Sequence, residues 1–346
     1  RADVIARHKR LENKDVFFNT GTDEHGAKIF ENAVKEGKEV KEYVTGFSEK
    51  FKDLHQKLNI SYDGFIRTTD EKHVKAAEGI WGRCFDNGYI YKKNYQAKYC
   101  VGCELTKNDS ELVDGKCEIH PTREIEFIDE ENYFFAFSKL QEKLLEFYSS
   151  NPTFVVPQTR YNEIKSFVDR GLEDFSISRL KSKMPWGVAV PGDDAHVMYV
   201  WFDALTSYIS TLGWPEKGDF EKFWQQRDKR EVVQYCGKDN LRQQAAMWQA
   251  MLMAADLPLS TQIVIDGFIM SGGQKMSKST GNVINPLEII EEYSGVTDYP
   301  EDVLRFVLLH DISSFEDGDI TKETIATSYV SHLQNGIGNL TNRIMK

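Results

Sequence analysis

Four metal-binding side chains stand in two short pairs in this sequence. Cys100 and Cys103 form the first pair, Cys117 and His120 form the second, and thirteen residues lie between the two pairs. Three thiolates and one imidazole make a tetrahedral donor set for zinc, and each two-residue gap lets a tight knuckle aim both ligands at one ion. Because a complete set of four leaves no open coordination position, the pattern predicts a closed structural zinc site.

Disulfides and unrelated free thiols are the alternatives for these cysteines. The chain has five cysteines in 346 residues, and no apolar leader segment is apparent. Both observations argue against disulfides and favour a cytosolic protein. The other two cysteines, Cys84 and Cys236, lie in a helical and a strand pattern, so we expect them to be core thiols.

A loop rich in glycine and lysine is the second feature that could do chemistry. It runs from Ser271 to Asn282 and places Lys275 and Lys278 three residues apart. Two lysines at this spacing can both reach one polyphosphate, and the hydroxyls and backbone amides of the loop can supply further donors. On composition alone, a solvated turn is the alternative to phosphate binding.

The overall composition limits the classes to which the protein can belong. The length of 346 residues corresponds to roughly two to three domains at about 150 residues each. The 28% charged and 40% hydrophobic residues are typical of a globular protein. The longest apolar runs, such as 197–202, have six residues and are too short to span a bilayer. A net charge of −11 excludes a generally basic surface for nucleic acid but allows a local basic patch.

A repeating order of strands and helices must position these loops. A polar loop that contains Asp23 follows an apolar run and precedes a helical pattern, and a similar order returns later in the chain. Strands that alternate with helices predict a parallel sheet with right-handed crossovers, in which ligands bind beyond the carboxyl ends of the strands. The expected strands are 16–18, 197–202, 232–236 and 263–265, and the expected helices are 27–35 and 40–58.

The alternation breaks between residues 91 and 194, which contain the cysteine pairs and an acidic stretch. We therefore expect an insertion between two halves of the sheet. After the last strand, Asn285 and Pro286 are typical of a helix start, with Asn as the cap and Pro in the first turn. An apolar stripe from Tyr329 to Ile344 has helical spacing and no later partner, so we expect the chain to stop inside a helical domain.

The lysine loop also carries a family resemblance. Residues 275–279 read Lys-Met-Ser-Lys-Ser, which is the KMSKS signature of class I aminoacyl-tRNA synthetases, and they follow the last predicted strand as in that family. Three further segments resemble motifs of methionyl-tRNA synthetases in the same order, and the knuckle resembles the single-zinc form of their connective insertion. These segments are 22–26, 199–208 and 237–239. The resemblance covers essentially the whole chain.

The resemblance implies an α/β fold with a Rossmann-like parallel-sheet catalytic domain, split by a zinc-binding connective insertion. A KMSKS and stem-contact module and the start of an α-helical anticodon-binding bundle would follow. The expected boundaries are 1–90 and 195–265 for the two parts of the catalytic domain, 91–194 for the insertion, 266–325 for the module and 326–346 for the start of the bundle.

The resemblance also implies methionine–tRNA ligase activity. The carboxylate of L-methionine would attack the α-phosphorus of ATP, bound with Mg²⁺, and the methionyl group would then pass to the terminal ribose of tRNA(Met). One structural zinc, a cytoplasmic location and no membrane partner complete this expectation. Lys275 and Lys278 would stabilise the charge that develops on the phosphates, and Gly237 and Asp239, together with the two lysines, would bind ATP.

Several residues would surround methionine by the same resemblance. Asp23 would hold the α-ammonium group, with a helix N-cap as its alternative role. Trp201, Ala204 and Tyr208 would line the thioether pocket, with a plain core position as the alternative for Trp201. Arg179 would counter Asp23 or a phosphate, unless it is a surface arginine.

Three further positions near this pocket are compared with the family pattern by the same resemblance. Gln244 stands where many members of the family have a pocket histidine, and we include it among the methionine-binding candidates. Leu205 replaces a proline that some members have. His25 is expected to be mainly structural, as it is at this position in the family.

The largest departure from the family pattern is the His-x-Gly-His signature, whose histidines bind ATP phosphates. Neither histidine can come from residues 1–346. We therefore expect this segment, expressed alone, to bind zinc but to show no appreciable methionine-dependent ATP–pyrophosphate exchange.

Two other functions remain open from the sequence. A cysteinyl- or branched-chain-specific synthetase also has the KMSKS loop, although the former places zinc in its pocket and the latter has a much larger insertion. A non-catalytic zinc-ribbon protein that binds RNA is the alternative outside the enzymes. Lys92, Lys93 and Lys98 are candidate tRNA contacts near the knuckle, with a solvated charged face as the alternative.

Overall fold

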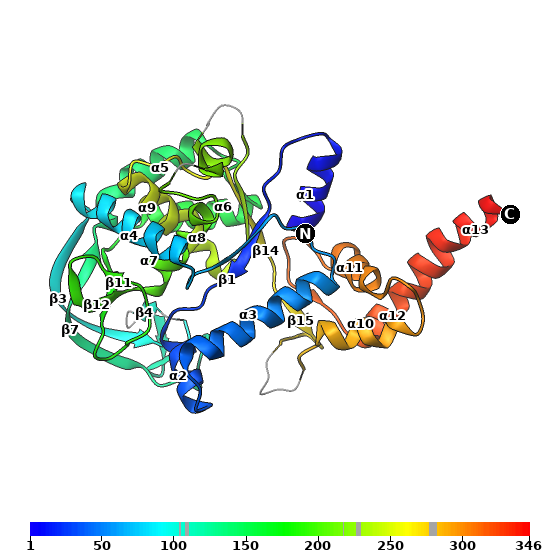
Figure 1. Ribbon diagram of the computed structural model, residues 1–346, viewed down its shortest axis with the longest axis horizontal. Coiled ribbons are helices and arrows are strands. Elements are labelled where there is room, and N and C mark those ends of the chain that lie inside the picture. Colours follow the sequence, from blue (N-terminus) through cyan, green and yellow to red (C-terminus); the bar gives the residue numbers. More distant parts are fainter. Residues whose placement is uncertain (104, 108–110, 217, 226–229, 277–281) are drawn as a thin grey trace.

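The computed structural model describes residues 1–346 except 104, 108–110, 217, 226–229 and 277–281. Figure 1 shows a larger α/β body and, beside it, a group of helices from α10 (Pro286–Ser294) to α13 (Asn339–Met345) that extends toward the C-terminus. We call residues 286–345 the helical module. Among the helices described, none combines the length and the apolar character needed to cross a bilayer.

Two sets of parallel strands lie in the larger body and confirm the parallel arrangement predicted from the sequence. In the first set, β1 (Asn19–Thr22) pairs with β2 (Gly64–Arg67). In the second set, β14 (Gln262–Asp266) lies between β13 (Val233–Gly237) and β8 (Val155–Val156). The last two strands predicted from the sequence are therefore confirmed as β13 and β14.

The first strand begins later in the chain than its apolar run. The prediction of a strand at 16–18 is wrong, because the paired residues are Asn19–Thr22, most of which were expected to form a loop. A Cβ atom at Gly21 would lie only 1.9 Å from the carbonyl oxygen of Ile66. The strand therefore forms where a missing side chain lets two backbones approach, and not where the apolar residues stand.

The apolar run at 197–202 is not a parallel strand, so this prediction is also wrong. Its first two residues end β12 (Asp193–Met198), which pairs antiparallel with β10 (Ser178–Leu180) and β11 (Ala189–Val190). Its last three residues begin helix α7 (Val200–Ala204). A short apolar run does not distinguish a buried strand from a buried helix. This run contains the end of strand β12 and the start of helix α7.

Helices cover the strands of the body. The helices α2 (Ala27–Lys35) and α3 (Val40–Lys57) confirm the two that the sequence predicted. The other long helices of the body are α1 (Ala2–Leu11), α4 (Glu71–Asp86), α5 (Gln141–Ser150), α6 (Gln158–Asp169) and α9 (Trp248–Ala254). One continuous core contains side chains from α4, α5, α6 and α9, including the fully buried Trp248.

An antiparallel sheet leads to the cysteine pairs. Its long strands β3 (Ile90–Cys100) and β7 (Glu126–Phe135) pair with each other, and the short strands β4 (Leu105–Lys107) and β9 (Phe175–Ser176) flank them. This sheet lies almost entirely within the predicted insertion at 91–194. Strand β8 of the parallel sheet lies there as well, so the boundaries of the insertion stay a prediction.

The helical module has a core of its own. Helix α10 begins as predicted, since Asn285 Oδ1 accepts a hydrogen bond from Leu287 N at 3.1 Å and Pro286 lies in the first turn. Side chains of α10, α11 (Pro300–His310) and α12 (Lys322–Ser328) form this core. The predicted terminal helix is confirmed as η7 (Tyr329–Gly338), which continues into α13.

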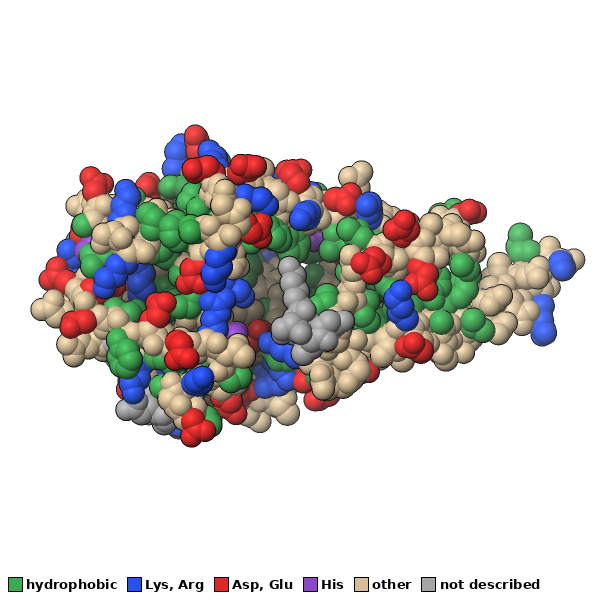
Figure 2. Space-filling view, turned by 90° about the horizontal axis from the view of Figure 1, so that it is seen from below, with side chains coloured by type: hydrophobic (Ala, Val, Ile, Leu, Met, Phe, Trp, Pro, Cys, Tyr) green, Lys and Arg blue, Asp and Glu red, His purple; other side chains and the backbone are tan. Residues whose placement is uncertain are grey.

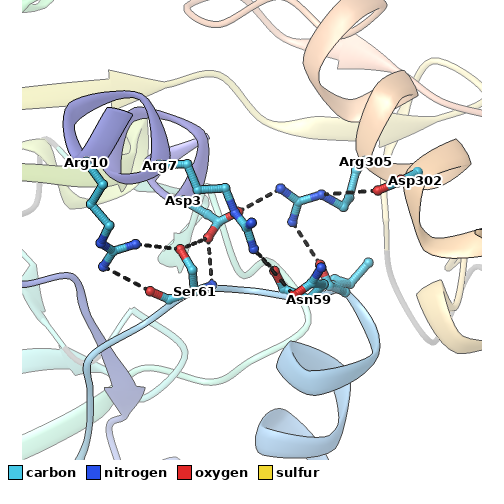
Figure 3. Close-up of polar contacts among 8 residues, drawn as sticks. Asp3, Arg7, Arg10, Asn59, Ser61, Asp302 and Arg305 are labelled. Carbon is cyan, nitrogen blue, oxygen red and sulfur yellow. Dashed lines mark hydrogen bonds and ion pairs between the residues drawn. The ribbon is translucent and has the colours of Figure 1, made fainter. Parts of the chain in front are cut away.

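A network of charged side chains joins the helical module to the body (Figure 3). The buried Asp3 of α1 accepts hydrogen bonds from Ser61 N and Oγ, both at 2.7 Å, from Arg305 Nη2 at 2.7 Å and from Arg7 Nε at 3.0 Å. Burial alone would raise the pKa of Asp3, but the hydrogen bonds from Ser61 and Arg305 outweigh burial and lower it. Because Arg305 belongs to α11, this carboxylate holds α11 against α1.

Candidate active site and metal centre

The Cys-Cys pair and the Cys-His pair lie close together, as the sequence predicted. Cys100 ends β3 and Cys117 ends β6 (Lys116–Cys117), and one ligand atom from each of the four residues lies within 4.8 Å of the others. The Sγ atoms of Cys103 and Cys117 are 3.4 Å apart. His120 Nδ1 lies 3.2 Å from Cys103 Sγ and 3.9 Å from Cys100 Sγ.

These separations fit a tetrahedral zinc site. Bonds of about 2.3 Å to sulfur and 2.0 Å to nitrogen place neighbouring ligand atoms roughly 3.5 to 3.8 Å apart. A Cβ atom at Gly102 would lie 2.5 Å from the ring of His120, so the glycine lets the imidazole close over the first pair. The donor set and its spacing therefore suit one zinc ion with no open position.

None of the five cysteines forms a disulfide. Cys84 is fully buried in α4, and Cys236 is partly buried in β13 against the same core. Burial raises the pKa of Cys236 to about 12, so its thiol stays protonated. The prediction of two core thiols is confirmed.

Lys275 and Met276, at the start of the KMSKS segment, have defined contacts, whereas Lys278 lies outside the described residues. Lys275 ends β16 (Gln274–Lys275), which pairs with β15 (Ile269–Ser271). Its Nζ lies 4.5 Å from the ring centroid of Phe268. Met276 packs against the core of the helical module.

The Gly-Lys-Asp segment meets the same aromatic ring. Strand β13 ends at Gly237, and Lys238 Nζ lies 4.5 Å from the ring centroid of Phe268 while it pairs with Asp317 at 2.7 Å. Two ammonium groups from separate loops therefore share one ring at the carboxyl end of a parallel strand. Gly237 and Asp239 were predicted from the sequence, whereas Lys238 was not, although it lies between them.

Three predicted pocket residues lie on two short helices that follow β12. Trp201 and Ala204 belong to α7, and Tyr208 belongs to α8 (Ser207–Ser210). All three are partly exposed, so Trp201 is not a plain core residue. Its indole Nε1 is buried and has no hydrogen-bond partner among the described residues. An unpaired buried donor of this kind suits a ligand with an acceptor atom.

Gln244 contacts the pocket through Tyr208. Its Nε2 donates to the Tyr208 hydroxyl at 2.7 Å, and its Oε1 accepts from Gln234 Nε2 at 3.0 Å. Gln234 Oε1 accepts from Ser260 Oγ at 2.5 Å, and Ser260 N donates to Gln249 Oε1 at 3.1 Å. We call these five residues the amide chain. Burial raises the pKa of Tyr208, so every member of the amide chain stays neutral near pH 7.

Asp23 lies exposed in the loop after β1. Its Oδ1 accepts a hydrogen bond from His25 N at 3.4 Å. Helix α2 has Gly26 at its N-cap, so the alternative role of Asp23 as a cap is wrong. Burial has the largest effect on the pKa values of His25, which it lowers, and Tyr208, which it raises, and the charge of Asp23 raises both.

A buried ionic group, which the sequence analysis missed, joins this loop to the pocket helices. Asp203 of α7 is fully buried, with its Oδ2 at 2.5 Å from His25 Nδ1 and its Oδ1 at 2.6 Å from His73 Nε2. His73 Nδ1 lies 3.0 Å from Ser210 Oγ in α8. We call His25, Asp203 and His73 the buried triad. Their sequence separation gave no local pattern that could have joined them.

The buried triad carries charge. Burial alone would raise the pKa of Asp203, but the charge and hydrogen bond of His25 and the bond of His73 outweigh burial and lower it to about 2. Burial alone would lower the pKa of His25, but the charge and hydrogen bond of Asp203 outweigh it and raise that pKa. The loop is thus held to α7 by an ion pair.

Glu24 fixes the same loop from the other side and was also missed. Its buried carboxylate accepts hydrogen bonds from Thr22 Oγ1 at 2.7 Å, Arg67 Nε at 2.7 Å and Thr69 Oγ1 at 2.5 Å. Trp186 Nε1 donates to its backbone oxygen at 2.6 Å. Asp23 therefore lies between two anchored neighbours, Glu24 and the strand residue Thr22.

Arg179 is buried rather than a surface arginine. Its guanidinium lies 4.9 Å and 5.0 Å from the ring centroids of Tyr99 and Tyr199. Its Nη1 donates to Ser176 Oγ at 3.0 Å and to Ser178 O at 2.7 Å. These contacts fix the arginine beside the start of α7, while its role toward Asp23 or a phosphate stays a prediction.

The candidate tRNA-contacting lysines are engaged within the antiparallel sheet. Lys92 pairs with Asp193 at 2.8 Å and lies 4.9 Å from the ring centroid of Tyr133. Lys93 lies 4.8 Å from the ring centroid of Phe134. A contact between tRNA and Lys92, Lys93 or Lys98 stays a prediction.

Figure 2 shows a hollow between the larger body and the helical module, with Lys and Arg side chains along its edge. The loops that carry Asp23 and Asp239 follow the carboxyl ends of the parallel strands β1 and β13. Ligands of parallel sheets bind at such an edge. A separate surface cavity of about 470 Å³ lies along α3 between Lys38 and Lys50 and contains none of the candidate residues. The position of these loops at the ends of parallel strands is the stronger guide to the site.

Comparison with protein families settles the relationship of the chain. The model of the family described as tRNA synthetases class I (M) matches residues 1–124 and 102–345. The chain belongs to this family. The resemblance that the KMSKS string and the ordered motifs indicated is therefore confirmed, and so is the α/β fold.

Curated relatives in the class I (M) tRNA synthetase family match nearly the whole chain. The methionine–tRNA ligase of Caldanaerobacter subterraneus subsp. tengcongensis is 43% identical over 344 residues, which are 99% of this chain and 52% of that protein. The methionine–tRNA ligase of Rickettsia bellii is also 43% identical, over 99% of this chain and 65% of that protein. The chain thus spans about half to two thirds of the length of these relatives.

Solved structures of this synthetase family have the same fold. The Mycobacterium tuberculosis methionyl-tRNA synthetase in complex with methionyl-adenylate is 40% identical with a TM-score of 0.91, over 99% of this chain and 65% of that one. The apo form of the Mycobacterium tuberculosis enzyme gives a TM-score of 0.80 at 34% identity, over 99% of this chain and 63% of that one.

Proposed function

We propose that this chain is part of a methionine–tRNA ligase, a class I enzyme that activates L-methionine with ATP and transfers the methionyl group to tRNA(Met). The observation that carries the proposal is the TM-score of 0.91, over 99% of this chain, with a methionyl-tRNA synthetase in complex with methionyl-adenylate. An aminoacyl-adenylate forms from the amino acid and ATP, so the same two substrates are proposed here. A cytoplasmic location belongs to the same proposal.

The pocket helices supply the contacts for methionine in this proposal. Trp201, Ala204 and Tyr208 provide apolar and polarizable surface for the thioether, and Gln244 holds Tyr208 in place. The unpaired indole N–H of Trp201 supports a ligand at this position, because an unsatisfied buried donor costs about 1–3 kcal/mol. Asp23 accepts a charge-assisted hydrogen bond from the α-ammonium group.

The ATP side of the site combines the two lysine-bearing loops. Lys275 and Lys278 stabilise negative charge on the phosphates, with Mg²⁺ bound to ATP, while Gly237 and Asp239 contact the nucleoside. The contact of both Lys238 and Lys275 with the ring of Phe268 supports this arrangement, because it connects the two loops through one side chain. Arg179 adds positive charge near α7.

A single zinc ion is proposed at the knuckle. Cys100, Cys103, Cys117 and His120 would hold it, and the ion would crosslink the end of β3 to the segment after β6. With four protein ligands the ion is structural. This closed set also disfavours a cysteinyl-specific enzyme, which would need an open zinc position in its pocket.

The test is ATP–pyrophosphate exchange by the full-length protein whose reading frame contains this chain, with methionine, cysteine and leucine compared. We expect methionine to support exchange best. Better support by cysteine or leucine contradicts the methionine assignment, and no exchange with any amino acid favours the non-catalytic RNA-binding alternative.

A variant at Asp23 tests the pocket itself. Loss of a charge-assisted hydrogen bond costs about 1.5–3 kcal/mol, so Asp23→Asn should raise the KM for methionine roughly 10- to 100-fold. The KM for ATP should change little. The matched control is Asp15→Asn, because Asp15 is 79% exposed and lies outside the site. Equal effects of the two substitutions would contradict the role of Asp23.

A further inference from the structure

Three side chains with metal-binding atoms lie together where helix α11 ends, apart from both the knuckle and the pocket. His310 is the last residue of α11, Asp311 follows it, and His332 lies in η7. One ligand atom from each lies within 4.8 Å of the others. All three side chains are exposed to solvent. The group therefore consists of two imidazoles and one carboxylate in contact with water.

The first imidazole is fixed by its neighbours on α11. His310 Nδ1 lies 2.5 Å from Asp311 Oδ1. The ring of Phe306, one turn earlier, stacks on the ring of His310 at 4.8 Å and 16°. Burial alone would raise the pKa of Asp311, but its hydrogen bond with His310 outweighs burial and lowers it, so the carboxylate carries its charge.

The second imidazole is held by the packing of η7. The rings of His310 and His332 have centroids 4.5 Å apart at 47°. Tyr329 packs edge-on against Tyr293 of α10 at 5.4 Å, and Leu333 packs against the core of the helical module. These contacts on both sides of His332 fix the backbone that carries it.

We propose that His310, Asp311 and His332 form a second metal site, which takes one exchangeable divalent ion of the zinc class. Imidazole and carboxylate suit Zn²⁺, and imidazole also suits Cu²⁺ and Ni²⁺. Three protein ligands leave the remaining coordination positions open to water, in contrast to the closed knuckle.

The ion would connect two helices that are distant along the chain. It joins the end of α11 to η7 and spans the segment 311–328, which includes α12. Because a ligand that binds only the folded form stabilises it, metal binding should raise the midpoint of thermal unfolding as its concentration rises. The proposal does not depend on ligase activity.

The experiment measures zinc bound per chain by the full-length protein without a histidine tag, in equilibrium dialysis against a fixed concentration of free zinc. We expect His332→Ala and His310→Ala each to lose one equivalent relative to the unsubstituted protein. The control is His8→Ala, because His8 is a 64% exposed histidine on α1 outside the cluster. This control should lose no zinc.

Replacement of zinc by Cu²⁺, Ni²⁺ or Co²⁺ distinguishes the knuckle from the second metal site. Co²⁺ at the knuckle gives the charge-transfer absorption of thiolate ligands, and Co²⁺ bound through His310 and His332 gives none. Zinc should also raise the unfolding midpoint of the unsubstituted protein more than that of His332→Gln. Unchanged zinc content in both histidine variants, with midpoints that respond equally to zinc, would overturn the proposal.

Discussion

The pocket helices α7 and α8 are held from two sides by different chemistry. On one side, Asp203 of the buried triad binds His25 and His73 with a full negative charge. On the other side, Tyr208 of the amide chain binds Gln244 through neutral groups. Both sides consist of side chains joined by hydrogen bonds, and they differ in that only the first carries charge.

The charged side should be the more fragile of the two. A buried charge costs several kcal/mol to remove from water, and only its partners compensate that cost. A hydrogen bond between neutral groups contributes about 1 kcal/mol net to stability. Its loss costs little more than the desolvation of the group that is left unpaired. The stability of the charged side should therefore respond strongly both to substitution and to pH. The neutral side should respond weakly to substitution and not at all to pH.

The largest effect is expected for Asp203→Asn. The substitution keeps the shape of the side chain but removes the charge that compensates His25, so it should lower the free energy of unfolding by about 3–5 kcal/mol. Urea unfolding of the zinc-loaded protein measures this. Asp86→Asn, at an exposed carboxylate of α4, should stay within about 0.5 kcal/mol of the unsubstituted protein. Similar losses in the two variants would show that the buried charge has no special role.

A smaller effect is expected for Gln244→Leu. The substitution leaves the Tyr208 hydroxyl and Gln234 Nε2 without their partner, which should cost about 1–3 kcal/mol of stability. The KM for methionine should rise because Tyr208 loses its fixed orientation. Urea unfolding and exchange kinetics test the two statements. A loss as large as that of Asp203→Asn would erase the distinction between the two sides.

The pH dependence distinguishes the sides most directly. The folded pKa of His25 is raised, so the stability it contributes is fully present below its ordinary pKa of about 6.5 and is lost as pH rises through the folded pKa. NMR of the histidine side chains should show the titration of His25 at pH values above about 6.5 in the unsubstituted protein and in Gln244→Leu. In Asp203→Asn the titration of His25 should move to lower pH. A titration that also moved in Gln244→Leu would mean that the two sides are coupled.

The smallest effect is expected for Tyr208→Phe. Removal of the hydroxyl leaves one buried amide proton of Gln244 unpaired, at a cost of about 1 kcal/mol. Tyr299→Phe removes a hydroxyl from a 65% exposed tyrosine and should change stability by less than about 0.5 kcal/mol. Equal urea midpoints for both variants would place the Tyr208 hydroxyl outside the amide chain.

Local patterns in the sequence predicted the features that depend on near neighbours. The knuckle needs two ligands at a fixed spacing in each pair, so Cys100 to His120 could be assigned without a structure. Helices α2 and α3 follow from periodic apolar residues, and the cap at Asn285 from a single residue type. The motifs around Trp201 and Lys275 were found through family resemblance, because nothing in their local chemistry specifies methionine.

Features that depend on distant partners could not be predicted. His73 and Asp203 are 130 residues apart, and each alone looks like an ordinary surface residue in its local pattern. The strand at Asn19–Thr22 was missed because close backbone approach at Gly21 decided it, and not apolar content. The buried position of Arg179 depends on Tyr99 and Tyr199, which lie in two other segments.

The carboxylate of Asp3 has a consequence for the order in which the molecule assembles. Asp3 meets Arg305 across 302 residues of chain, and Arg1 meets Asp266 across 265. During synthesis from the N-terminus, α1 therefore emerges long before the arginine that covers its carboxylate. Contacts of such high sequence separation form slowly, because the entropy of closing the chain must be lost first. The network in Figure 3 can therefore form only after Arg305 has been synthesised, close to the end of this chain segment.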